Sequence, residues 1–409
     1  MEYTKEEAGY TMTTVAEEAA RCLLCHDAPC SRDCPADTDP GSFIRSVRFR
    51  NFKGAAETIR ENNAMGAICA RVCPTERYCE LACSRTEIDV PIDIGGIQRF
   101  VTDFEQQADM DILKKAPANG KSIAIVGSGP AGLQAATTLL QKGYAVDIYE
   151  KKEKAGGYLS YGIPEYRLPT DIVEYEIKRI KNLGAQFFYK QVIGKDVTLD
   201  HLKENYDGVI LAIGADSGKM LPLFENNPYA ETAISFLAKA RENKGQIDLP
   251  EKALVIGGGD VAMDVNVTLK LLGVEHVTDV VYEEFSEFKA SQTELDLAQK
   301  HGATIVDGYV PESVDGNEVT FKARNMEGQL TIKADKIYLA VGQKVNADGL
   351  PLPLENEEVK FNGYQTDDSQ VFVAGDIAKG DKTVVWAVQK GKEAARAVDQ
   401  FLGGKDDDK

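Results

Sequence analysis

Eight cysteines, all within the first 83 residues of a 409-residue chain, have the most distinctive chemistry in the sequence. They form two blocks of four, and the last cysteine of the first block and the second of the next are each followed by proline. Thiolate runs that end in Cys-Pro are typical of proteins with two iron–sulfur clusters. The ligand candidates are Cys22, Cys25, Cys30 and Cys34 in the first block and Cys69, Cys73, Cys79 and Cys83 in the second.

The same thiols leave two alternatives to iron–sulfur chemistry. Structural zinc sites usually take two close pairs of ligands for each metal, and the mixed spacings here fit that pattern poorly. Free or redox-sensing thiols come third, and a disulfide framework is not expected in a reducing cytoplasm. Eight thiols match two [4Fe–4S] clusters at four ligands each. Helical spacing over 41–63 and 98–107 predicts a small helical domain that wraps both clusters.

The stretch 121–150 predicts a dinucleotide-binding unit. A short apolar strand, 123–126, leads into glycines at G-x-G-x-x-G spacing, and an apolar helix to Gly143 and a strand at 145–149 follow. The glycines allow a tight turn, a close approach to a pyrophosphate, and close packing of helix on strand. An acidic residue after the second strand would accept hydrogen bonds from the ribose hydroxyls. The candidates are Gly127, Ser128, Gly129, Pro130, Ala131, Gly132 and Glu150.

A second motif of the same kind begins 130 residues later. Strand 253–256, a G-x-G-x-x-A turn, helix 262–272 and strand 276–282 repeat the pattern. Two such folds in one chain imply two dinucleotides. The second strand ends in Tyr282-Glu283, and an acidic group there favours the free 2′-hydroxyl of NADH over NADPH. The turn itself contributes Gly257, Gly258, Gly259, Asp260 and Val261.

Other stretches between and after the motifs suggest cofactor contacts. Gly156 and Gly157 would let the backbone lie against a cofactor, and Arg167 in YGIPEYRLP could meet a phosphate or a flavin edge, with a surface arginine as the alternative. A helix is expected over 170–183 and another over 383–402. Strand endings at 209–214 and 337–342 resemble each other, and VFVAGDIAK predicts a strand that runs into Gly375-Asp376.

Charge and hydropathy limit the partners. The formal net charge of −18 argues against nucleic acids and anionic membrane surfaces. No apolar run approaches the roughly 18 residues of a membrane span, and the first residues lack the apolar region of a signal peptide. We expect a cytoplasmic protein. No C-x-x-C lies in or near the second fold, which argues against a thioredoxin reductase.

Over essentially its whole length the chain resembles a known family of flavoproteins. It is similar to the small subunit of bacterial glutamate synthase and to the N-terminal half of mammalian dihydropyrimidine dehydrogenase. The resemblance is strongest to the electron-input subunit of bacterial NAD-dependent dihydropyrimidine dehydrogenase. The stretches that carry it are RCLLCHDAPC, NFKGAAETIRENNA, ARVCPTE, IQRFVTDFEQQ, LPLFE, ALVIGGGDVAMDV and GDKTVV.

This resemblance implies an α/β fold with tandem Rossmann-like FAD and NAD domains of the two-dinucleotide flavoprotein type, preceded by an α-helical iron–sulfur domain. The expected boundaries are 1–115 for the helical domain, 116–245 for the first part of the FAD domain, 246–345 for the NAD domain, and 346–409 for the rest of the FAD domain with a C-terminal helix.

The resemblance also implies which residues contact the cofactors. FAD would contact the first glycine turn together with Glu150, Lys151, Gly156, Gly157 and Tyr158, with Arg167 nearby and the backbone of Ile193 at the adenine. Its ribityl chain and ring would meet Gly375, Asp376 and Thr383. NAD would be lined by Gly258, Gly259, Asp260, Val261, Tyr282, Glu283, Ala340, Val341 and Gly342. The mammalian enzyme has arginine and lysine where this chain has Tyr282 and Glu283, and these serve NADPH there.

For the clusters, the resemblance implies two ligand sets. The first is Cys22, Cys25, Cys30 and Cys83. The second is Cys34, Cys73 and Cys79, with Gln98 as the fourth ligand. In the mammalian enzyme a glutamine at this position, in the same sequence setting as I-G-G-I-Q here, is the fourth ligand. A thiolate is ordinarily the better cluster ligand, so Cys69 competes with Gln98 for that place.

The implied activity is electron input. NADH would pass hydride to N5 of FAD, and the electrons would leave singly through two [4Fe–4S] clusters. Hydride transfer needs alignment of donor and acceptor rather than acid–base catalysis, so no catalytic general base is expected. A (β/α)8 barrel alone takes about 250 residues, so the terminal reduction must occur on a partner. We expect an FMN- and iron–sulfur-containing catalytic subunit that reduces uracil and thymine, in a hetero-oligomer. A glutamate-synthase-like electron donor and a non-enzymatic cluster-bearing module are the alternatives.

Overall fold

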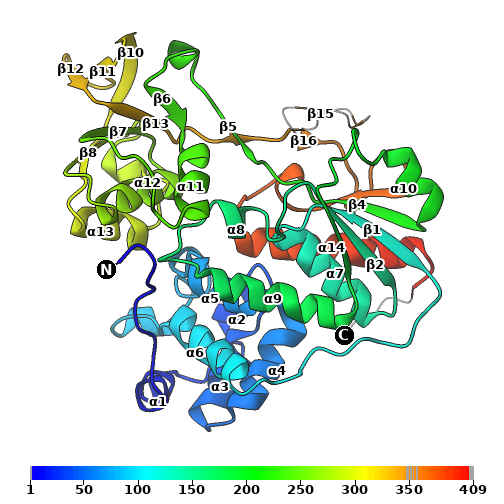
Figure 1. Cartoon of the computed structure of the whole chain (residues 1–409). Coiled ribbons are helices and arrows are strands. Elements are labelled where there is room, and N and C mark those ends of the chain that lie inside the picture. The colour runs from blue at the N-terminus through cyan, green and yellow to red at the C-terminus, as the bar shows by residue number, and fades with distance from the viewer. Residues whose placement is uncertain (1, 347–349, 351, 353, 356–357, 405–409) are drawn as a thin grey trace. The chain divides into compact units, whose positions relative to one another are not determined.

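The computed structural model describes residues 2–346, 350, 352, 354–355 and 358–404, and it forms two compact units (Figure 1). Unit 1 comprises Met1–Glu7, Tyr161–Pro169 and Asp216–Lys344. Unit 2 comprises Ala8–Ser160, Thr170–Ala215 and Val345–Lys409. The helical segment and the first glycine motif therefore share one unit, whereas residues 216–245 belong with the second motif. The four-part division expected from the sequence stays a prediction.

Unit 2 is built on a five-stranded parallel sheet in the order β17-β4-β1-β2-β3. Its central strand has buried side chains from Ile123 to Val126, as expected for a parallel strand covered on both faces. The strands are β1 (Ser122–Val126), β2 (Ala145–Glu150), β3 (Gln186–Tyr189), β4 (Gly208–Leu211) and β17 (Val371–Val373).

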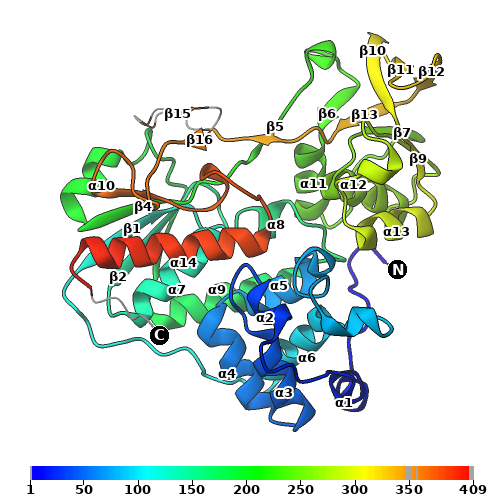
Figure 2. The same ribbon diagram turned by 180° about the vertical axis from the view of Figure 1, so that it is seen from behind.

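Helices α7 (Pro130–Gln141) and α14 (Val384–Phe401) run side by side in unit 2 (Figure 2). A Cβ at Gly391 would lie only 2.2 Å from the Ala131 carbonyl oxygen, so glycine allows this contact. The expected helix after β2 is also confirmed: α9 runs Thr170–Leu183. The C-terminal helix thereby covers the helix that follows the first glycine turn.

The helical part of unit 2 contains α1 to α6 around one apolar core, which includes Phe43, Ile59 and Val101. The helical structure predicted over 41–63 is confirmed. It consists of two helices, because Arg50 has φ +58° and the Asn51 side chain caps the second helix by accepting a hydrogen bond from the Gly54 N–H at 3.0 Å. The helices are α1 (Met12–Ala20), α2 (Pro29–Arg32), α3 (Pro40–Arg48), α4 (Phe52–Asn62), α5 (Gly66–Val72) and α6 (Ile94–Gln107).

Helix α6 also begins earlier than the sequence pattern suggested. Asp93 accepts a hydrogen bond from the Gly96 N–H at 2.7 Å, and this N-cap starts the helix at Ile94 rather than near Gln98. The first turn of α6 therefore includes two glycines, and the helix extends four residues further toward the N-terminus than the expected 98–107. Gln98 is consequently one turn inside α6.

An ion network, buried except at the edge of one arginine, joins the helical part to α9. Arg60 of α4 contacts Glu105 of α6 at 2.7 Å and Glu176 of α9 at 2.8 Å, and Arg179 of α9 contacts Glu105 at 3.1 Å. Two cations and two anions balance one another. Burial alone would lower the pKa of the Arg60 guanidinium, but the charges of Glu176 and Glu105 raise it well above its ordinary value. The network ties three helices together.

Unit 1 has a second five-stranded parallel sheet, in the order β6-β13-β7-β8-β9, and an antiparallel sheet β10-β11-β12. Figure 1 shows α11, α12 and α13 beside the parallel sheet. Tyr3 packs into the same core as Tyr166 and Phe236. The elements are β6 (Ala230–Thr232), α11 (Ala233–Glu242), β7 (Lys252–Ile256), α12 (Asp260–Leu271), β8 (His276–Val280), α13 (Gln292–Lys300), β9 (Thr304–Val306), β10 (Tyr309–Asp315), β11 (Glu318–Ala323), β12 (Gln329–Lys333) and β13 (Lys336–Leu339).

The remaining elements are short. They are 3-10 turns at Thr75–Arg77, Ser84–Glu87, Pro222–Phe224, Phe285–Glu287 and Gly375–Ile377, helices α8 (Tyr158–Tyr161) and α10 (Leu199–Asn205), and strands β5 (Ser217–Gly218), β14 (Gln343–Lys344), β15 (Leu354–Glu355) and β16 (Glu358–Val359). None of the helices in the described part of the chain combines the length and apolar character that a bilayer crossing requires.

Candidate iron–sulfur and dinucleotide sites

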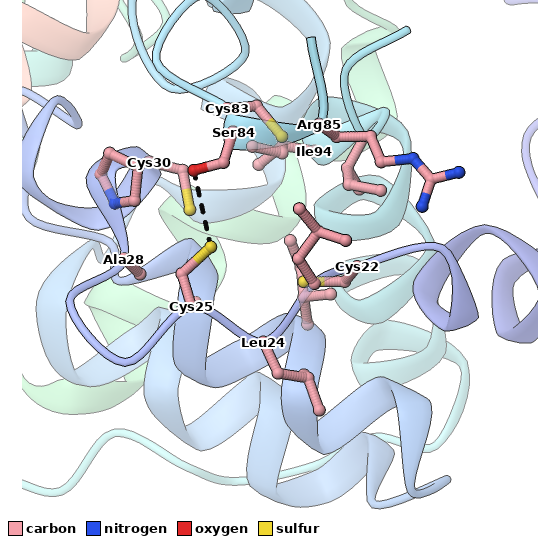
Figure 3. A pocket seen from close by; sticks show the side chains of 14 residues that line it. Cys22, Leu24, Cys25, Ala28, Cys30, Cys83, Ser84, Arg85 and Ile94 are labelled. Atoms are coloured by element: carbon pink, nitrogen blue, oxygen red, sulfur yellow. Dashed lines mark hydrogen bonds between the residues drawn. The ribbon is translucent and has the colours of Figure 1, made fainter. Parts of the chain in front are cut away.

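One cavity in unit 2 brings four of the cysteines together (Figure 3). Cys22 and Cys25 come from the turn after α1, Cys30 from α2, and Cys83 from the residue before the Ser84–Glu87 turn. Apolar side chains such as Ile44 line the rest of the cavity. Cysteines from both sequence blocks therefore meet at one place, as the resemblance implied.

The other four cysteines form a second group nearby. Cys34, Cys69 and Cys79 are buried. Burial raises the pKa of the Cys73 thiol well above its ordinary value, and the charges of Cys69, Cys79 and Cys34 raise it further, so these thiols lie within short electrostatic range. Burial likewise raises the pKa of the Cys79 thiol well above its ordinary value, and the charges of Glu80, Cys34 and Cys30 raise it further. The two thiol groups are therefore neighbours.

Cys69 and Gln98 both lie beside the second group. Gln98 is 7% exposed, and its Nε2 donates to the carbonyl of Gly66 at 2.7 Å. Gly66 begins α5, the helix that carries Cys69. Burial raises the pKa of the Cys69 thiol to about 12, although a hydrogen bond with Asn63 opposes the shift. The eighth ligand stays a prediction with two candidates.

The arrangement of the thiols favours clusters over mononuclear zinc. In a [4Fe–4S] cluster each thiolate binds a different iron, so the sulfurs stand around the group rather than at one point. Four cysteines around one cavity match that geometry.

The first glycine turn has the close backbone approaches that a dinucleotide site needs. Gly127 has φ +104°, and a Cβ there would lie 2.3 Å from the Ala212 carbonyl oxygen. A Cβ at Gly132 would lie 2.0 Å from the Gly127 carbonyl oxygen. Beside Gly129 there is open space within 4 Å, at the N-terminus of α7. Free N–H groups at that helix end suit a phosphate.

Glu150 holds this turn against the following loop. Its carboxylate accepts hydrogen bonds from the N–H of Ser128 at 3.1 Å, from the Ser128 hydroxyl, and from the N–H of Lys152 at 2.8 Å. The Ser128 oxygen in turn accepts from the N–H of Gly156 at 3.2 Å. Gly157 packs against Gly129, where a Cβ would lie 3.0 Å from the Gly129 Cα. The loops at 127–132 and 150–157 therefore form one surface.

The end of β17 brings a third loop to this surface. A Cβ at Gly375 would lie 3.0 Å from the Cβ of Ala131. Asp376 is half-buried, and its buried Oδ1 atom has no hydrogen-bond partner among the described residues. Burial raises the pKa of the Asp376 carboxyl, with Lys390 and Lys382 opposing the shift. A buried carboxylate oxygen without a protein donor fits the hydroxyl groups of a flavin ribityl chain, so the residues present suit FAD.

Four further residues expected at the FAD site are placed as follows. Lys151 is exposed just after β2, and Tyr158 begins α8. Ile193 lies in the loop after β3, where it makes a bridge to Val197. Thr383 is the N-cap residue of α14. Their contacts with FAD stay predictions.

The second glycine turn repeats the close approaches in unit 1. A Cβ at Gly257 would lie 2.4 Å from the Ala340 carbonyl oxygen, and one at Gly258 would lie 2.4 Å from Cγ1 of Val281. Beside Gly259 the space is open. The turn leads directly into α12, which begins at Asp260-Val261. Ala340 at the end of β13 therefore lies against the turn, and the contacts of Ala340, Val341 and Gly342 with NAD stay predictions.

Two cations that the sequence reading missed lie beside the acidic end of this fold. Lys289 Nζ is 2.8 Å from Glu283 Oε1. Burial opposes ionisation of Glu283, but Lys289 holds the pKa of that carboxyl below its usual value. The Arg324 guanidinium lies 3.9 Å from the centroid of the Tyr282 ring and donates to the Tyr282 carbonyl at 2.9 Å. Nothing local in the sequence marks either cation, because they come from a later loop and from the end of β11.

Arg167 belongs to unit 1, where its side chain is 13% exposed. Its guanidinium contacts both carboxylate oxygens of Asp264, at 2.7 and 2.8 Å, and Glu294 at 2.9 Å. This bidentate pair fixes the YGIPEYRLP segment on α12 and α13. A contact between Arg167 and FAD stays a prediction.

Two side chains outside both motifs join the thiol groups to the first dinucleotide fold. Tyr78, next to Cys79, donates to Asp381 Oδ2 at 3.0 Å. Lys392 of α14 donates to the carbonyl of Ala36 at 2.7 Å, two residues after Cys34. Both contacts join residues close to the second thiol group with the part of the chain after β17, through the loop at Asp381 and helix α14. The sequence carries no signal for them, since they join residues about 300 and 350 positions apart.

Comparison with known proteins gives two matching family models. Residues 1–110 match the model described as dihydropyrimidine dehydrogenase domain II, 4Fe-4S cluster. Residues 121–395 match pyridine nucleotide-disulphide oxidoreductase. The boundary between these matches falls after α6 and before β1.

Curated relatives match the chain over nearly its full length. An NAD-dependent dihydropyrimidine dehydrogenase subunit PreT of Escherichia coli O157:H7 is 54% identical over 97% of this chain and 96% of that protein. The PreT subunit of Salmonella typhimurium LT2 is 51% identical over 96% of both. Among solved structures, Mycobacterium tuberculosis FprA in complex with NADPH has a TM-score of 0.59 at 19% identity, over 70% of this chain and 85% of FprA. Lactococcus lactis thioredoxin reductase has a TM-score of 0.55 at 20% identity, over 69% and 99%. These structures share the fold.

Proposed function

The chain belongs to the family of the NAD-dependent dihydropyrimidine dehydrogenase subunit PreT, and from this membership we propose that it is the electron-input subunit of a two-component dihydropyrimidine dehydrogenase. Bound FAD and two [4Fe–4S] clusters would together turn a hydride from NADH into single electrons. The chain itself holds these groups and sets the distances between them. The pyrimidine chemistry belongs to its partner.

The observation that carries this proposal is the packing within unit 2. Both thiol groups and the first glycine turn lie in one compact unit, and the Arg60 network, Tyr78–Asp381 and Lys392–Ala36 fasten the helical part to the FAD-type fold. One-electron transfer needs donor and acceptor held at a short, constant distance. A helical part that is anchored by buried ion pairs provides that distance.

The contacts also support an order for the two thiol groups. Tyr78, next to Cys79, contacts Asp381 in the loop that follows β17, and Ala36, two residues after Cys34, accepts from Lys392 of α14. The first group borders the cavity that Leu23 and Arg85 line. We propose that electrons enter through the second group and leave through the first.

We propose that the partner is an FMN- and iron–sulfur-containing catalytic subunit that reduces uracil and thymine in the cytoplasm. The test is NADH oxidation dependent on uracil, with this chain alone, with the partner alone, and with both. Turnover is expected only with both. Uracil reduction by this chain alone would contradict the proposal.

A glutamate-synthase-like role is the alternative, and the same assay separates the two. Stimulation by a large glutamine-using subunit, together with no response to uracil, would favour that alternative. Loss of all NADH–dye activity in a flavin-loaded sample would point to a non-enzymatic module instead.

Coenzyme choice gives a first prediction. Glu283→Gln removes a negative charge from the end of the second fold and breaks its ion pair with Lys289, so a 2′-phosphate meets less repulsion beside a lysine. We expect kcat/KM for NADPH to rise by about tenfold, which corresponds to about 1.4 kcal/mol, while that for NADH falls severalfold. The measurement is NAD(P)H–ferricyanide activity under both coenzymes.

The matched control for this prediction is Glu312→Gln, an exposed glutamate on β10 in the antiparallel sheet. It removes the same charge from unit 1 and should leave the NADH:NADPH ratio unchanged. An unchanged ratio in the Glu283 variant would show that this carboxylate does not select the coenzyme.

A further inference from the structure

The first thiol group is bordered by an exposed surface that is both apolar and basic. We define the thiol rim by Leu23, Phe49, Ile88 and Val90 together with Arg45, Arg48 and Arg50. The four apolar side chains are 46%, 71%, 62% and 62% exposed. Large apolar side chains gathered at one site of a folded protein mark an interaction surface.

Direct contacts connect this surface to the cavity. Leu23 is one of the residues that line the cavity. Arg85 lines it beside Cys83 (Figure 3). The Arg85 Nε is 2.8 Å from Asp89, which stands between Ile88 and Val90. The cavity and the apolar residues that flank Asp89 are therefore one continuous surface.

Arg21 strengthens the same edge. Its Nη2 donates to the carbonyl of Val90 at 2.7 Å, and its own carbonyl accepts from Arg85 at 3.0 Å. Arg21 directly precedes Cys22. The position of Val90 is thus fixed relative to a predicted cluster ligand.

The basic part of the rim comes from the end of α3. Arg48 donates to the carbonyl of Cys22 at 2.8 Å, and Phe49 follows it. Arg45, Arg48 and Arg50 are exposed, and in the described part of the chain none of them forms an ion pair within 4.0 Å. Helix α3 contains no acidic residue, although the whole chain carries a net charge of −18. The exposed positive charge therefore lies at the end of α3, whereas Asp39 caps the start of this helix and Asp89 pairs with Arg21 and Arg85 at the other edge of the rim.

We propose that the thiol rim is the docking surface for the FMN-bearing catalytic subunit, which meets it with acidic and apolar side chains around its own redox centre. The inference rests on the proposed function, because it assigns the surface through which that function delivers electrons. Electron transfer between proteins falls steeply with distance, so the acceptor must cover the exit group. A standard interface buries about 800 Å² on each partner, enough to span both the Ile88–Val90 edge and the end of α3.

The test uses two double variants of the holo-protein that leave the cluster ligands intact. Ile88→Ser/Val90→Ser removes apolar contact area, and Arg45→Glu/Arg50→Glu reverses the charge. The partner is the purified catalytic subunit, titrated in the uracil-dependent NADH oxidation assay. Each double variant should raise the apparent KM for the partner at least tenfold. The charge variant should also lose the decrease in rate that added salt causes in the wild type.

Matched controls come from unit 1. Met326→Ser removes an exposed apolar side chain, 70% exposed, and Lys333→Glu reverses an exposed charge on β12. Both should titrate like the wild type. NADH–ferricyanide activity and NADH-driven bleaching of the cluster absorbance should stay within twofold of wild type in every variant, which shows that the internal electron path is intact.

The outcomes separate this inference from the function beneath it. If the rim variants titrate like the wild type, the thiol rim is not the docking surface, and the proposed function is unaffected. No uracil-dependent turnover with the wild type would overturn the proposed function and the inference together. Two further results would also overturn the proposal, provided that the partner titration is unchanged. One is self-association of the chain that the rim variants abolish, and the other is binding to phosphatidylserine vesicles that they abolish. Either result would assign the rim to another occupant.

Discussion

Replacing Cys83 by serine removes one cluster and leaves the other in place. Cys83 belongs to the second cysteine block by sequence but lines the cavity with Cys22, Cys25 and Cys30. We expect iron to fall from about eight to about four atoms per chain, since each [4Fe–4S] cluster has four irons. Because this group is the proposed exit, uracil reduction with the partner should fall more than 100-fold while NADH–ferricyanide activity persists. Iron analysis, EPR of the reduced protein and the two assays measure this.

The comparison variant is Cys79→Ser, which lies in the second group. It should also lose about four irons, but the cluster that remains should no longer be reduced by NADH, because the group next to the FAD-type fold is missing. Ser84→Ala is the control, since it removes only the 3.6 Å contact of Cys25 Sγ with a hydroxyl. Equal EPR behaviour of the Cys83 and Cys79 variants would contradict the proposed order of the groups.

Replacing Arg60 by alanine should cost about 3–5 kcal/mol of folding free energy. The substitution leaves Glu105 and Glu176 fully buried with one cation, Arg179, between them. It also removes the hydrogen bond from Arg60 to the Ala64 carbonyl, at 2.6 Å. The measurement is urea unfolding of the holo-protein. The single tryptophan, Trp386, lies on α14 in unit 2 and reports on the affected unit.

The matched control is Arg32→Ala. Arg32 pairs with Asp27 at 2.8 Å, but both side chains are exposed, at 62% and 72%. Exposed pairs contribute about 0–1 kcal/mol, so this variant should unfold close to the wild type. A triple variant, Arg60→Met/Glu105→Gln/Glu176→Gln, should recover part of the loss because no buried charge lacks a partner. Equal destabilisation by Arg60→Ala and Arg32→Ala would contradict the role of the network.

The Arg60 network also bears on electron transfer. It joins α4 and α6, which flank the thiol-bearing segments, to α9 of the FAD-type fold. If it positions the second thiol group, a surviving Arg60 variant should reduce its clusters more slowly with NADH while its NADH–ferricyanide rate stays normal. A change confined to stability would limit Arg60 to a structural role.

The sequence alone determined the two dinucleotide folds and the chemistry of the first segment. Each glycine turn, its strand and its helix are neighbours along the chain, so the spacing of small and apolar residues specifies them without reference to the rest of the molecule. The predicted strands and helices around Gly127 and Gly257 are confirmed in β1, α7, β7 and α12. The count and type of the cysteines, with their Cys-Pro pairs, likewise indicate iron–sulfur ligation from local composition.

The spacing of apolar residues did not give the helix boundaries where a single residue ends or caps a helix. Spacing over 41–63 cannot show that Arg50 adopts φ +58° and splits the helix, and glycines at 95 and 96 concealed a helix that Asp93 starts. Both helix boundaries depend on the backbone angle or the capping hydrogen bond of a single residue, which the spacing of apolar residues does not show.

Tertiary structure decided everything that joins distant parts of the chain. Pairing of Arg60 with Glu176, of Arg324 with Tyr282 and of Lys392 with Ala36 spans from about 40 to about 350 residues, and no periodicity encodes partners at such separations. The residues alone left open which cysteines share a site. The resemblance implied that Cys83 binds with the first block. The structure places Cys83 there, because the Ser84–Glu87 turn packs against α2 and the turn after α1. Burial and charge then act on these distant neighbours, which is why the thiol rim and the buried network could be found only in the folded chain.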